Sequence, residues 1–256
     1  MTTTKKIIVR LACATVLGTA GVALTQVNRP QTAVVNAATT SVAARALGVD
    51  VASYQNADLS SHAQAGAQFA IVKVSEGTSY RNPKASSQIS TALSNNMMPM
   101  AYHFATFSSN ASAAAAEANY AIQTAQAFGL PKGSYIACDY ETGSGNNIYG
   151  GKTPTANAII AFMDTIKNAG YKPLLYASSS VLQNNIDTNS VIAKYPNSLW
   201  VASYAISGRI DSPNFNYFPS MNGVSIWQFT DNWKGLSVDG NIAVLPLSID
   251  GNVTSN

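Results

Sequence analysis

Residues 135–141, Tyr-Ile-Ala-Cys-Asp-Tyr-Glu, form a short apolar stretch that ends in two acids one residue apart. The pattern predicts a buried β-strand, and because side chains alternate across a strand, Asp139 and Glu141 point to the same side. Neighbouring carboxylates repel each other, which raises one pKa of the pair. A pair in which one acid is protonated and the other ionised is what cleavage of a glycosidic bond requires.

The chain around this strand alternates between strand and helix. Strands are predicted at 47–51, 69–77, 98–105, 135–141, 171–177, 199–204 and 224–229, with one or two more within 238–247. Helices are predicted at 56–68, 83–96, 110–128, 153–169 and, in a broken form, 180–194. Asn110 or Ser112 is expected to cap the third helix. Alternation favours a parallel sheet, and eight strands in about 210 residues favour closure. We therefore predict an α/β fold, a modified TIM-like barrel of five βα units followed by about three strands. An open doubly wound sheet is the alternative.

The first 37 residues have the order of a secretory signal peptide. Lys5, Lys6 and Arg10 precede an apolar run at 11–24, and a small-residue stretch follows at 35–38. The run is short and rich in small residues, which argues against a membrane span. An uncleaved anchor and a lipoprotein cleaved at Cys13 are the alternatives. The predicted organisation is a signal at 1–37, a linker at 38–46 and one catalytic domain at 47–256. The mature chain is expected outside the cell or in the cell wall, without stable membrane association.

Removal of the signal changes the charge and cysteine arguments. Residues 1–37 hold four of the fifteen Lys and Arg residues and no acid, so the net charge falls from +3 to −1. With neither a basic patch nor a Gly-rich phosphate loop, nucleic-acid and nucleotide binding are not expected. Cys138 becomes the only cysteine, and we interpret it as a small buried hydrophobic residue. Charged residues are only 11% of the chain, and its polar surface suits hydroxyl-rich partners.

Acids gather where the predicted strands end. Only Glu117 and Asp164 among the twelve acids clearly fall on helices, as surface acids should. The strand-associated acids are Asp50, Glu76, Asp139 and Glu141 at strand ends and Asp239 at the start of the last strand region. In a strand–helix barrel, the carboxyl ends of the strands form the active face. Aromatic residues that could contact sugar rings fall in the same places, at Tyr54, Tyr102, Tyr140, Tyr176, Trp200, Tyr204 and Trp227. Core packing is the alternative for each of them, most of all for Tyr140 and Trp227.

These segments together resemble the family 25 glycoside hydrolases, the N-acetylmuramidase lysozymes that cleave bacterial peptidoglycan. The resemblance rests on residues 48–55 (GVDVASYQ), 72–77 (VKVSEG), 101–104 (AYHF), 139–141 (DYE), 175–176 (LY), 199–204 (LWVASY), 227–229 (WQF) and 238–241 (VDGN), in the family's order and spacing. Ser203 departs from many relatives, which carry His or another polar residue there.

The resemblance implies a barrel of five βα units plus three strands and assigns roles to the acids. Glu141 matches the general acid, Asp139 its partner, and Asp50 and Asp239 two further acids of the same groove. The positions implied to contact substrate are Tyr102, Tyr140, Tyr176, Trp200, Tyr204, Glu76 and Gln228. Peptidoglycan glycan strands are the expected partner of a monomeric enzyme, and no cofactor or metal is expected.

Residue spacing bears on the mechanism. Residues i and i+2 of a strand lie about 6.5–7 Å apart at Cα. Two acids leaving one strand on one side reach the far face of a sugar poorly, which favours attack by the substrate's own 2-acetamido oxygen, with Asp139 ionised and Glu141 protonated. His62 and His103 cannot form a metal site by themselves, and His103 is interpreted as a hydrogen-bonded core or rim residue. A chitinase-like enzyme, a glucosaminidase and a non-catalytic wall-binding protein are the alternatives. The chitinase-type D-x-x-D-x-D-x-E run is absent here.

Overall fold

A computed structural model describes residues 39–249 of the chain. The predicted signal at 1–37 lies outside the described residues, as do residues 250–256. Among the residues described, no helix has the length and apolar character needed to cross a membrane.

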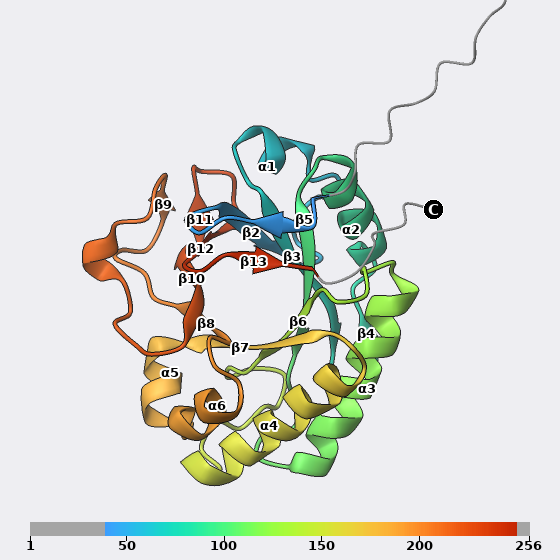
Figure 1. Cartoon of the computed structure of the whole chain (residues 1–256), viewed down its shortest axis with the longest axis vertical. Helices are drawn as coiled ribbons and strands as arrows, with labels where there is room; N and C mark the ends of the chain where they lie inside the picture. The colour runs from blue at the N-terminus through green and yellow to red at the C-terminus, as the bar shows by residue number, and fades with distance from the viewer. Residues whose placement is uncertain (1–38, 250–256) are drawn as a thin grey trace, which may run out of the picture. The chain divides into compact units, whose positions relative to one another are not determined.

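The fold is a closed eight-stranded barrel (Figure 1). Its strands are β2 (Leu47–Val51), β3 (Phe69–Glu76), β5 (Met98–Phe104), β6 (Tyr135–Asp139), β7 (Lys172–Ser178), β8 (Leu199–Ala202), β10 (Val224–Thr230) and β12 (Asp239–Ala243). The first seven pair in parallel in this order. Strand β12 runs antiparallel to both β10 and β2 and closes the ring. The predicted barrel is confirmed, and the open sheet is excluded.

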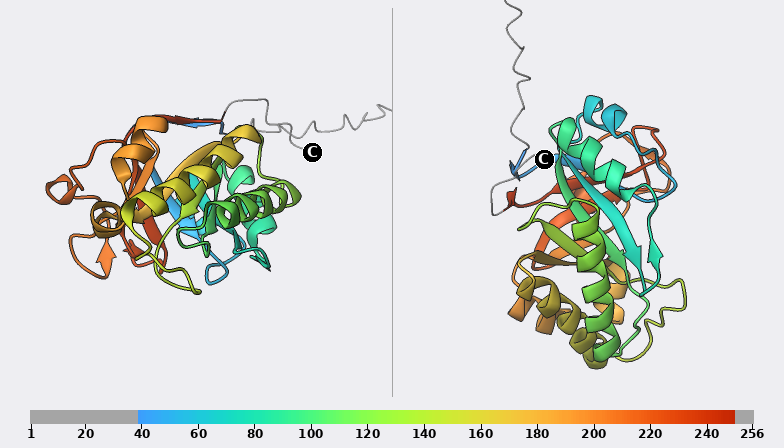
Figure 2. Two further views of the ribbon diagram at one scale, coloured as in Figure 1. Left: turned by 90° about the horizontal axis from the view of Figure 1, so that it is seen from below. Right: turned by 90° about the vertical axis from the view of Figure 1, so that its right-hand side faces the viewer.

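Helices cover only part of the barrel. They are α1 (Ser60–Gln64), α2 (Ala85–Ser94), α3 (Ala111–Ala127), α4 (Lys152–Asn168), α5 (Ser179–Asn184) and α6 (Thr188–Lys194). The side chain of Asn110 caps α3 by accepting from the backbone N–H groups of Ser112 and Ala113. Figure 2 shows α3 and α4 running side by side along the outside of the barrel. Each of the first five strands is therefore followed by helix, as the sequence predicts.

Irregular chain covers the barrel between β8 and β10. It contains β9 (Arg209–Ile210), which pairs with β11 (Asn232–Trp233), and a 3-10 helix at Phe215–Tyr217. Phe215 and Phe218 pack edge-on against the outward-facing ring of Trp227. Aromatic rings thus bury this side of the sheet, where elsewhere a helix does so.

Two apolar layers hold the barrel together. The outer layer lies between strands and helices and includes Cys138, which is buried and free, as expected. The inner layer fills the barrel with Phe69, Ile71, Met98, Met100, Leu174, Trp200 and Ile226 among others. Phe69 lies directly against Gly48, where an added Cβ would stand 2.3 Å from the ring. Glycine in β2 therefore gives an interior phenylalanine its space.

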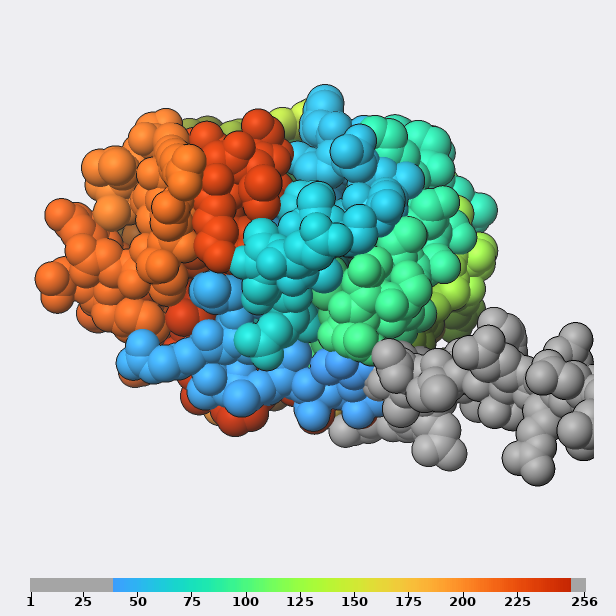
Figure 3. All heavy atoms as spheres, turned by 90° about the horizontal axis from the view of Figure 1, so that it is seen from above, coloured from blue at the N-terminus to red at the C-terminus, as the bar shows by residue number. Residues whose placement is uncertain are grey.

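Within the segment at 38–46, predicted to be a linker, two residues pack against the barrel. Strand β1 (Ser41–Val42) pairs antiparallel with β13 (Leu247–Ser248), and Val42 and Ala46 are buried in the inner layer. A further two-residue strand, β4 (Tyr80–Arg81), folds back on the end of β3. These strands are too short to produce a period in the sequence. Figure 3 shows the first and last described parts of the chain, blue and red, side by side on the surface.

Candidate active site

The predicted acids meet at one end of the barrel because of how its strands are directed. Asp50, Glu76 and Asp139 lie at or next to the carboxyl ends of parallel strands, and Glu141 lies two residues beyond β6. Asp239 is the first residue of β12, but β12 is antiparallel, so its start lies at the same end and Asp239 pairs in register with Asp50. The structure therefore brings the five acids to one face.

Asp50 is buried at the centre of a hydrogen-bonded group. Its Oδ2 accepts from Gln228 Nε2 at 2.9 Å and from Asn241 Nδ2 at 2.7 Å. Burial raises the pKa of Asp50, and the hydrogen bonds from Asn241 and Gln228 offset part of that rise. Asp239 shares a further hydrogen bond with it, and burial together with the charge of Asp50 raises the pKa of Asp239 to about 9. At neutral pH Asp239 is thus the protonated donor and Asp50 the acceptor.

Asp139 and Glu141 differ in their access to solvent. Asp139 is 5% exposed, and its Oδ1 has no hydrogen-bond partner within the protein. Burial raises the pKa of Asp139 well above its ordinary value, and the charge of Glu141 adds to the rise. Glu141 is half-buried, and burial followed by the charge of Asp50 raises its pKa too. Both acids of the pair therefore have raised pKa values, and Asp139 is the more deeply buried of the two.

Lys73 supplies a positive charge to this acidic face. Its Nζ forms an ion pair with Glu76 Oε2 at 2.6 Å. Burial alone would raise the pKa of Glu76, but the hydrogen bond and charge of Lys73 bring it below its ordinary value. The charge of Lys73 also opposes the pKa rises of Asp139 and Glu141. Sequence reasoning assigned Lys73 no role, although a lysine inside an otherwise apolar strand was an available signal.

The aromatic residues predicted to contact substrate include accessible tyrosines and a buried tryptophan. Tyr176 and Tyr204 are partly exposed, and both hydroxyls donate to Gln228 Oε1, at 2.9 and 2.6 Å. Tyr102 is also partly exposed. Trp200 is 1% exposed and lies beneath them, with its ring centroid 4.4 Å from that of Tyr176. These three tyrosines can contact a ligand, whereas the buried Trp200 packs against the rings of Tyr102 and Tyr176.

Two buried amides connect the aromatic residues to Asp50. Gln228 is 1% exposed, so its predicted contact with substrate gives way to a role in linking Tyr176, Tyr204 and Asp50. Asn241 is fully buried, accepts from Trp200 Nε1 at 2.7 Å and donates to Asp50. Sequence reasoning quoted Asn241 within a motif but gave it no role, since a single asparagine in a strand produces no pattern.

The predicted contact between Tyr140 and a bound sugar is contradicted by the structure. Tyr140 is fully buried in the outer layer, where its ring packs against Phe107, and its hydroxyl donates to the carbonyl of Ser108 at 2.9 Å. Alternation places it opposite its neighbours Asp139 and Glu141. The core alternative was therefore correct for Tyr140.

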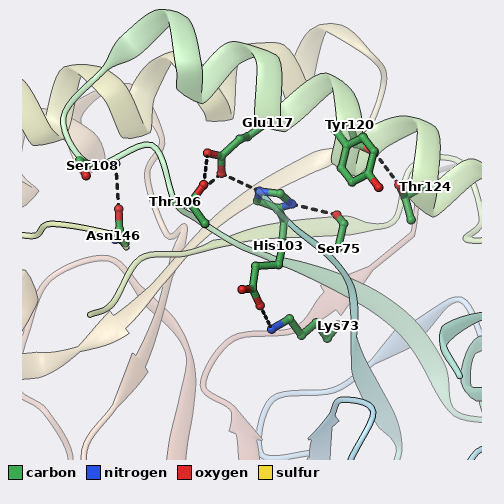
Figure 4. Close-up of polar contacts among 10 residues, drawn as sticks. Lys73, Ser75, His103, Thr106, Ser108, Glu117, Tyr120, Thr124 and Asn146 are labelled. Atoms are coloured by element: carbon green, nitrogen blue, oxygen red, sulfur yellow. Dashed lines mark hydrogen bonds and ion pairs between the residues drawn. The ribbon is translucent and has the colours of Figure 1, made fainter. Parts of the chain in front are cut away.

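A row of polar residues lies behind the barrel wall (Figure 4). His103 Nδ1 lies 2.8 Å from Ser75 Oγ, and His103 Nε2 lies 2.9 Å from Glu117 Oε2. Glu117 also accepts from the backbone N–H and the hydroxyl of Thr106. All three members of the row are at most 4% exposed, and burial lowers the pKa of His103. His103 is confirmed as a hydrogen-bonded core residue. Glu117, expected as a surface acid, is buried because these donors satisfy it.

The chain has known relatives in sequence. The sequence model of Glycosyl hydrolases family 25 matches residues 49–237. The chain is 39% identical over 178 residues to a lysozyme of Lactococcus phage mv1, covering 69% of this chain and 87% of that protein. It is 38% identical over 201 residues to a D-alanyl-L-alanine endopeptidase of Streptococcus phage B30, covering 77% of this chain and 42% of that one.

A solved structure shares the fold. The chain matches the Cpl-1 endolysin, solved in complex with a peptidoglycan analogue, with a TM-score of 0.69 and 33% identity. The match covers 82% of this chain and 57% of the endolysin. The chain thus spans about half the length of the endopeptidase and of the endolysin.

Proposed function

The chain belongs to family 25 of the glycosyl hydrolases, and from this premise we propose that it is a secreted peptidoglycan hydrolase. The bond cleaved is the β-1,4 bond between N-acetylmuramic acid and N-acetylglucosamine. The observation that carries the proposal is the pair of Asp139 and Glu141 on the acidic face, both with raised pKa values. A chain that buries an unpartnered Asp139 oxygen beside a more accessible Glu141 has the two carboxyl groups that glycoside hydrolysis uses.

Glu141 is the proposed general acid. It is the more exposed member of the pair, and its raised pKa favours the protonated form that a proton donor needs. Asp139 and Glu141 are neighbours with raised pKa values. The state in which the pair shares one proton is therefore favoured over the state in which both acids are ionised. In the free protein burial favours that proton on Asp139.

Substrate binding moves the proton to where it is needed. The free Oδ1 of Asp139 can accept a hydrogen bond from the N–H of a 2-acetamido group. That bond favours ionised Asp139, so the shared proton passes to Glu141. Glu141 then protonates the leaving glycosidic oxygen while the acetamido oxygen attacks the anomeric carbon. Asp139 stabilises the resulting positive charge, and water opens the cyclic intermediate with Glu141 as base. The product keeps the β configuration.

Asp50 and Asp239 complete the negative face. Asp50 is held by Gln228 and Asn241, and protonated Asp239 adds a third donor to it. A fixed carboxylate in this position stabilises positive charge that develops on the sugar ring. Tyr102, Tyr176 and Tyr204 offer apolar faces with polar tips to the sugars.

Mass spectrometry of fragments released from purified walls tests the reaction. Products with a reducing N-acetylmuramic acid end are expected. A reducing N-acetylglucosamine end would identify a glucosaminidase, preferential release from chitin a chitinase-like enzyme, and no release a binding protein. Proton NMR of the first-formed anomer tests the stereochemistry, and an initial α product would exclude substrate assistance.

Secretion and the monomeric state are parts of the same proposal. Secretion is supported by the charged, apolar and small-residue order of residues 1–37. The monomeric state is an expectation that size-exclusion chromatography would test. N-terminal sequencing of protein from the culture medium is expected to begin near Ala37 or Ala38. A product that begins at Met1 and stays with the cells would contradict secretion.

A further inference from the structure

We propose that Asn146 is a positioning residue that holds the backbone of Glu141 against the loop between β5 and α3. The inference rests on the proposed role of Glu141 as general acid. Glu141 lies beyond the last residue of β6, so no sheet ladder fixes it. Its carbonyl accepts from Asn146 Nδ2 at 2.8 Å. The side-chain amide of Asn146 thus gives the Glu141 backbone a hydrogen bond of the kind that a neighbouring strand gives within the sheet.

Asn146 is the buried member of an exposed turn. Residues 142–145 are exposed, whereas Asn146 is 6% exposed. The turn is closed by the Asn146 N–H, which donates to the carbonyl of Gly143 at 2.7 Å. Gly143, Ser144 and Gly145 all have positive φ. A left-handed conformation is unfavourable for a serine, so contacts elsewhere must hold the turn in this shape.

Ser108 is the other half of the contact, and its N–H, hydroxyl and carbonyl all bond to residues 140–147. Figure 4 shows the bond between Ser108 and Asn146. Its N–H donates to Asn146 Oδ1 at 2.8 Å, and its Oγ accepts from the N–H of Asn147 at 2.9 Å. Its carbonyl accepts from the hydroxyl of Tyr140 at 2.9 Å. Ser108 itself has φ 55°, a second left-handed residue held by this set of bonds.

The β5–α3 loop is held in place by the buried row of Ser75, His103 and Glu117 behind the barrel wall. Glu117 accepts from both the N–H and the hydroxyl of Thr106, two residues before Ser108. The Ala105 N–H donates to the carbonyl of Asp139 at 2.9 Å. The same short loop is therefore bonded to the backbone of Asp139 and, through Asn146, to the backbone of Glu141. It sets the separation of the two acids.

The test compares Asn146→Ala with Ser134→Ala. Ser134 is buried beside the opposite end of β6, where its Oγ donates to the carbonyl of Pro99 at 2.6 Å, so it controls for loss of a buried side-chain hydrogen bond. For Asn146→Ala, kcat on peptidoglycan is expected to fall about 10- to 100-fold with KM changed less than about threefold, because small displacements of a reacting group have this cost. Ser134→Ala is expected to keep the parental kcat at a similar loss of Tm.

The pH profile separates positioning from stability. Loosening the turn exposes Glu141 to water, which lowers its pKa, so the alkaline limb of kcat should move to lower pH in Asn146→Ala and stay in place in Ser134→Ala. Ser108→Gly keeps the bonds of the residue-108 backbone and suits the positive φ, but it loses the hydroxyl that accepts from Asn147, so kcat should fall less than in Asn146→Ala.

Two outcomes would overturn the inference. One is an Asn146→Ala variant with parental kcat and an unmoved alkaline limb. The other is an equal loss of kcat in Ser134→Ala at the same Tm. If Glu141→Gln is itself active, the proposed function fails. If Glu141→Gln is inactive and Asn146→Ala behaves like the parent, only the positioning role fails.

Discussion

Glu141→Gln is the decisive change among the acids of the acidic face. The amide keeps the size of the side chain but has no acidic proton to donate, so activity on cell walls should fall to near background while the folded state is retained. Turbidity loss of a cell suspension measures the rate, and circular dichroism checks the fold. Asp164→Asn, on the outer helix α4, is the matched control and should keep the parental rate. Near-parental clearing by Glu141→Gln would show that another group donates the proton.

Asp139→Asn separates function from stability at a single residue. We expect kcat to fall about 10²- to 10³-fold, since a neutral amide cannot stabilise positive charge as a carboxylate does. The Tm at pH 8 should be unchanged or higher, because burial and the charge of Glu141 already disfavour the ionised acid there. Thermal unfolding and steady-state kinetics give the two values. A clear drop in Tm would mean that the carboxylate contributes to the fold.

At the scale of single residues, the sequence predicted the groups that carry charge and missed those that hold them. Asp50, Asp139, Glu141 and Asp239 were predictable because an acid at a strand boundary is unusual in a chain with so few charges. Asn241 and Asn146 were not, because their hydrogen bonds join residues whose proximity exists only in the folded chain. Asn241, for instance, lies 191 residues from Asp50, its partner.

At the scale of elements, the attachment of α3 to β5 depends on a buried acid. Glu117→Ala would leave the side chain of His103 and both donors of Thr106 without their partner. The free energy of unfolding should fall by about 3–5 kcal/mol, as when one member of a buried polar pair is removed. Asn110→Ala, which removes only the cap of the same helix, should cost about 1 kcal/mol. Urea unfolding of both variants makes the comparison, and equal losses would count against a structural role for the buried row.

Element type followed from the sequence where an element is long enough to repeat a pattern. Helix α3 and strand β10, with 17 and 7 residues, agree with the predictions to within a residue or so at each end. The two-residue pairs of β1 with β13 and of β9 with β11 were missed, since tertiary contact alone creates them. Glu117 was misjudged for a related reason, because helical position does not reveal which face a helix buries.

At the scale of the whole molecule, the closure of the barrel should make stability depend on pH. Asp239 and Asp50 face each other across the β12–β2 pair, and the pKa of Asp239 is raised to about 9 by burial and by Asp50. Between its ordinary value and about 9, the folded protein binds a proton at Asp239 that the unfolded chain has released. The free energy of unfolding should therefore fall as pH rises through this window.

Asp239→Asn isolates this contribution. The amide remains a neutral donor to Asp50 at every pH. The free energy of unfolding should therefore decline less steeply from pH 5 to 9, with the slope reduced by at most about the amount that one bound proton contributes. The raised pKa values of Asp139 and Glu141 leave a residual slope of the same sign. Urea unfolding at several pH values measures it. An unchanged slope would place the bound proton on another acid.

The antiparallel strand β12 has a consequence for the time at which the site comes into being. Asp50, Asp139 and Glu141 come early as the chain emerges from its N-terminus, whereas Asp239 and Asn241 are among the last described residues to appear. A nascent chain that has emerged only through β10 has most of its acids, but Asp50 lacks its partners on β12 and the ring of strands is open. Hydrolytic competence should therefore arise in one late step, when β12 inserts between β10 and β2.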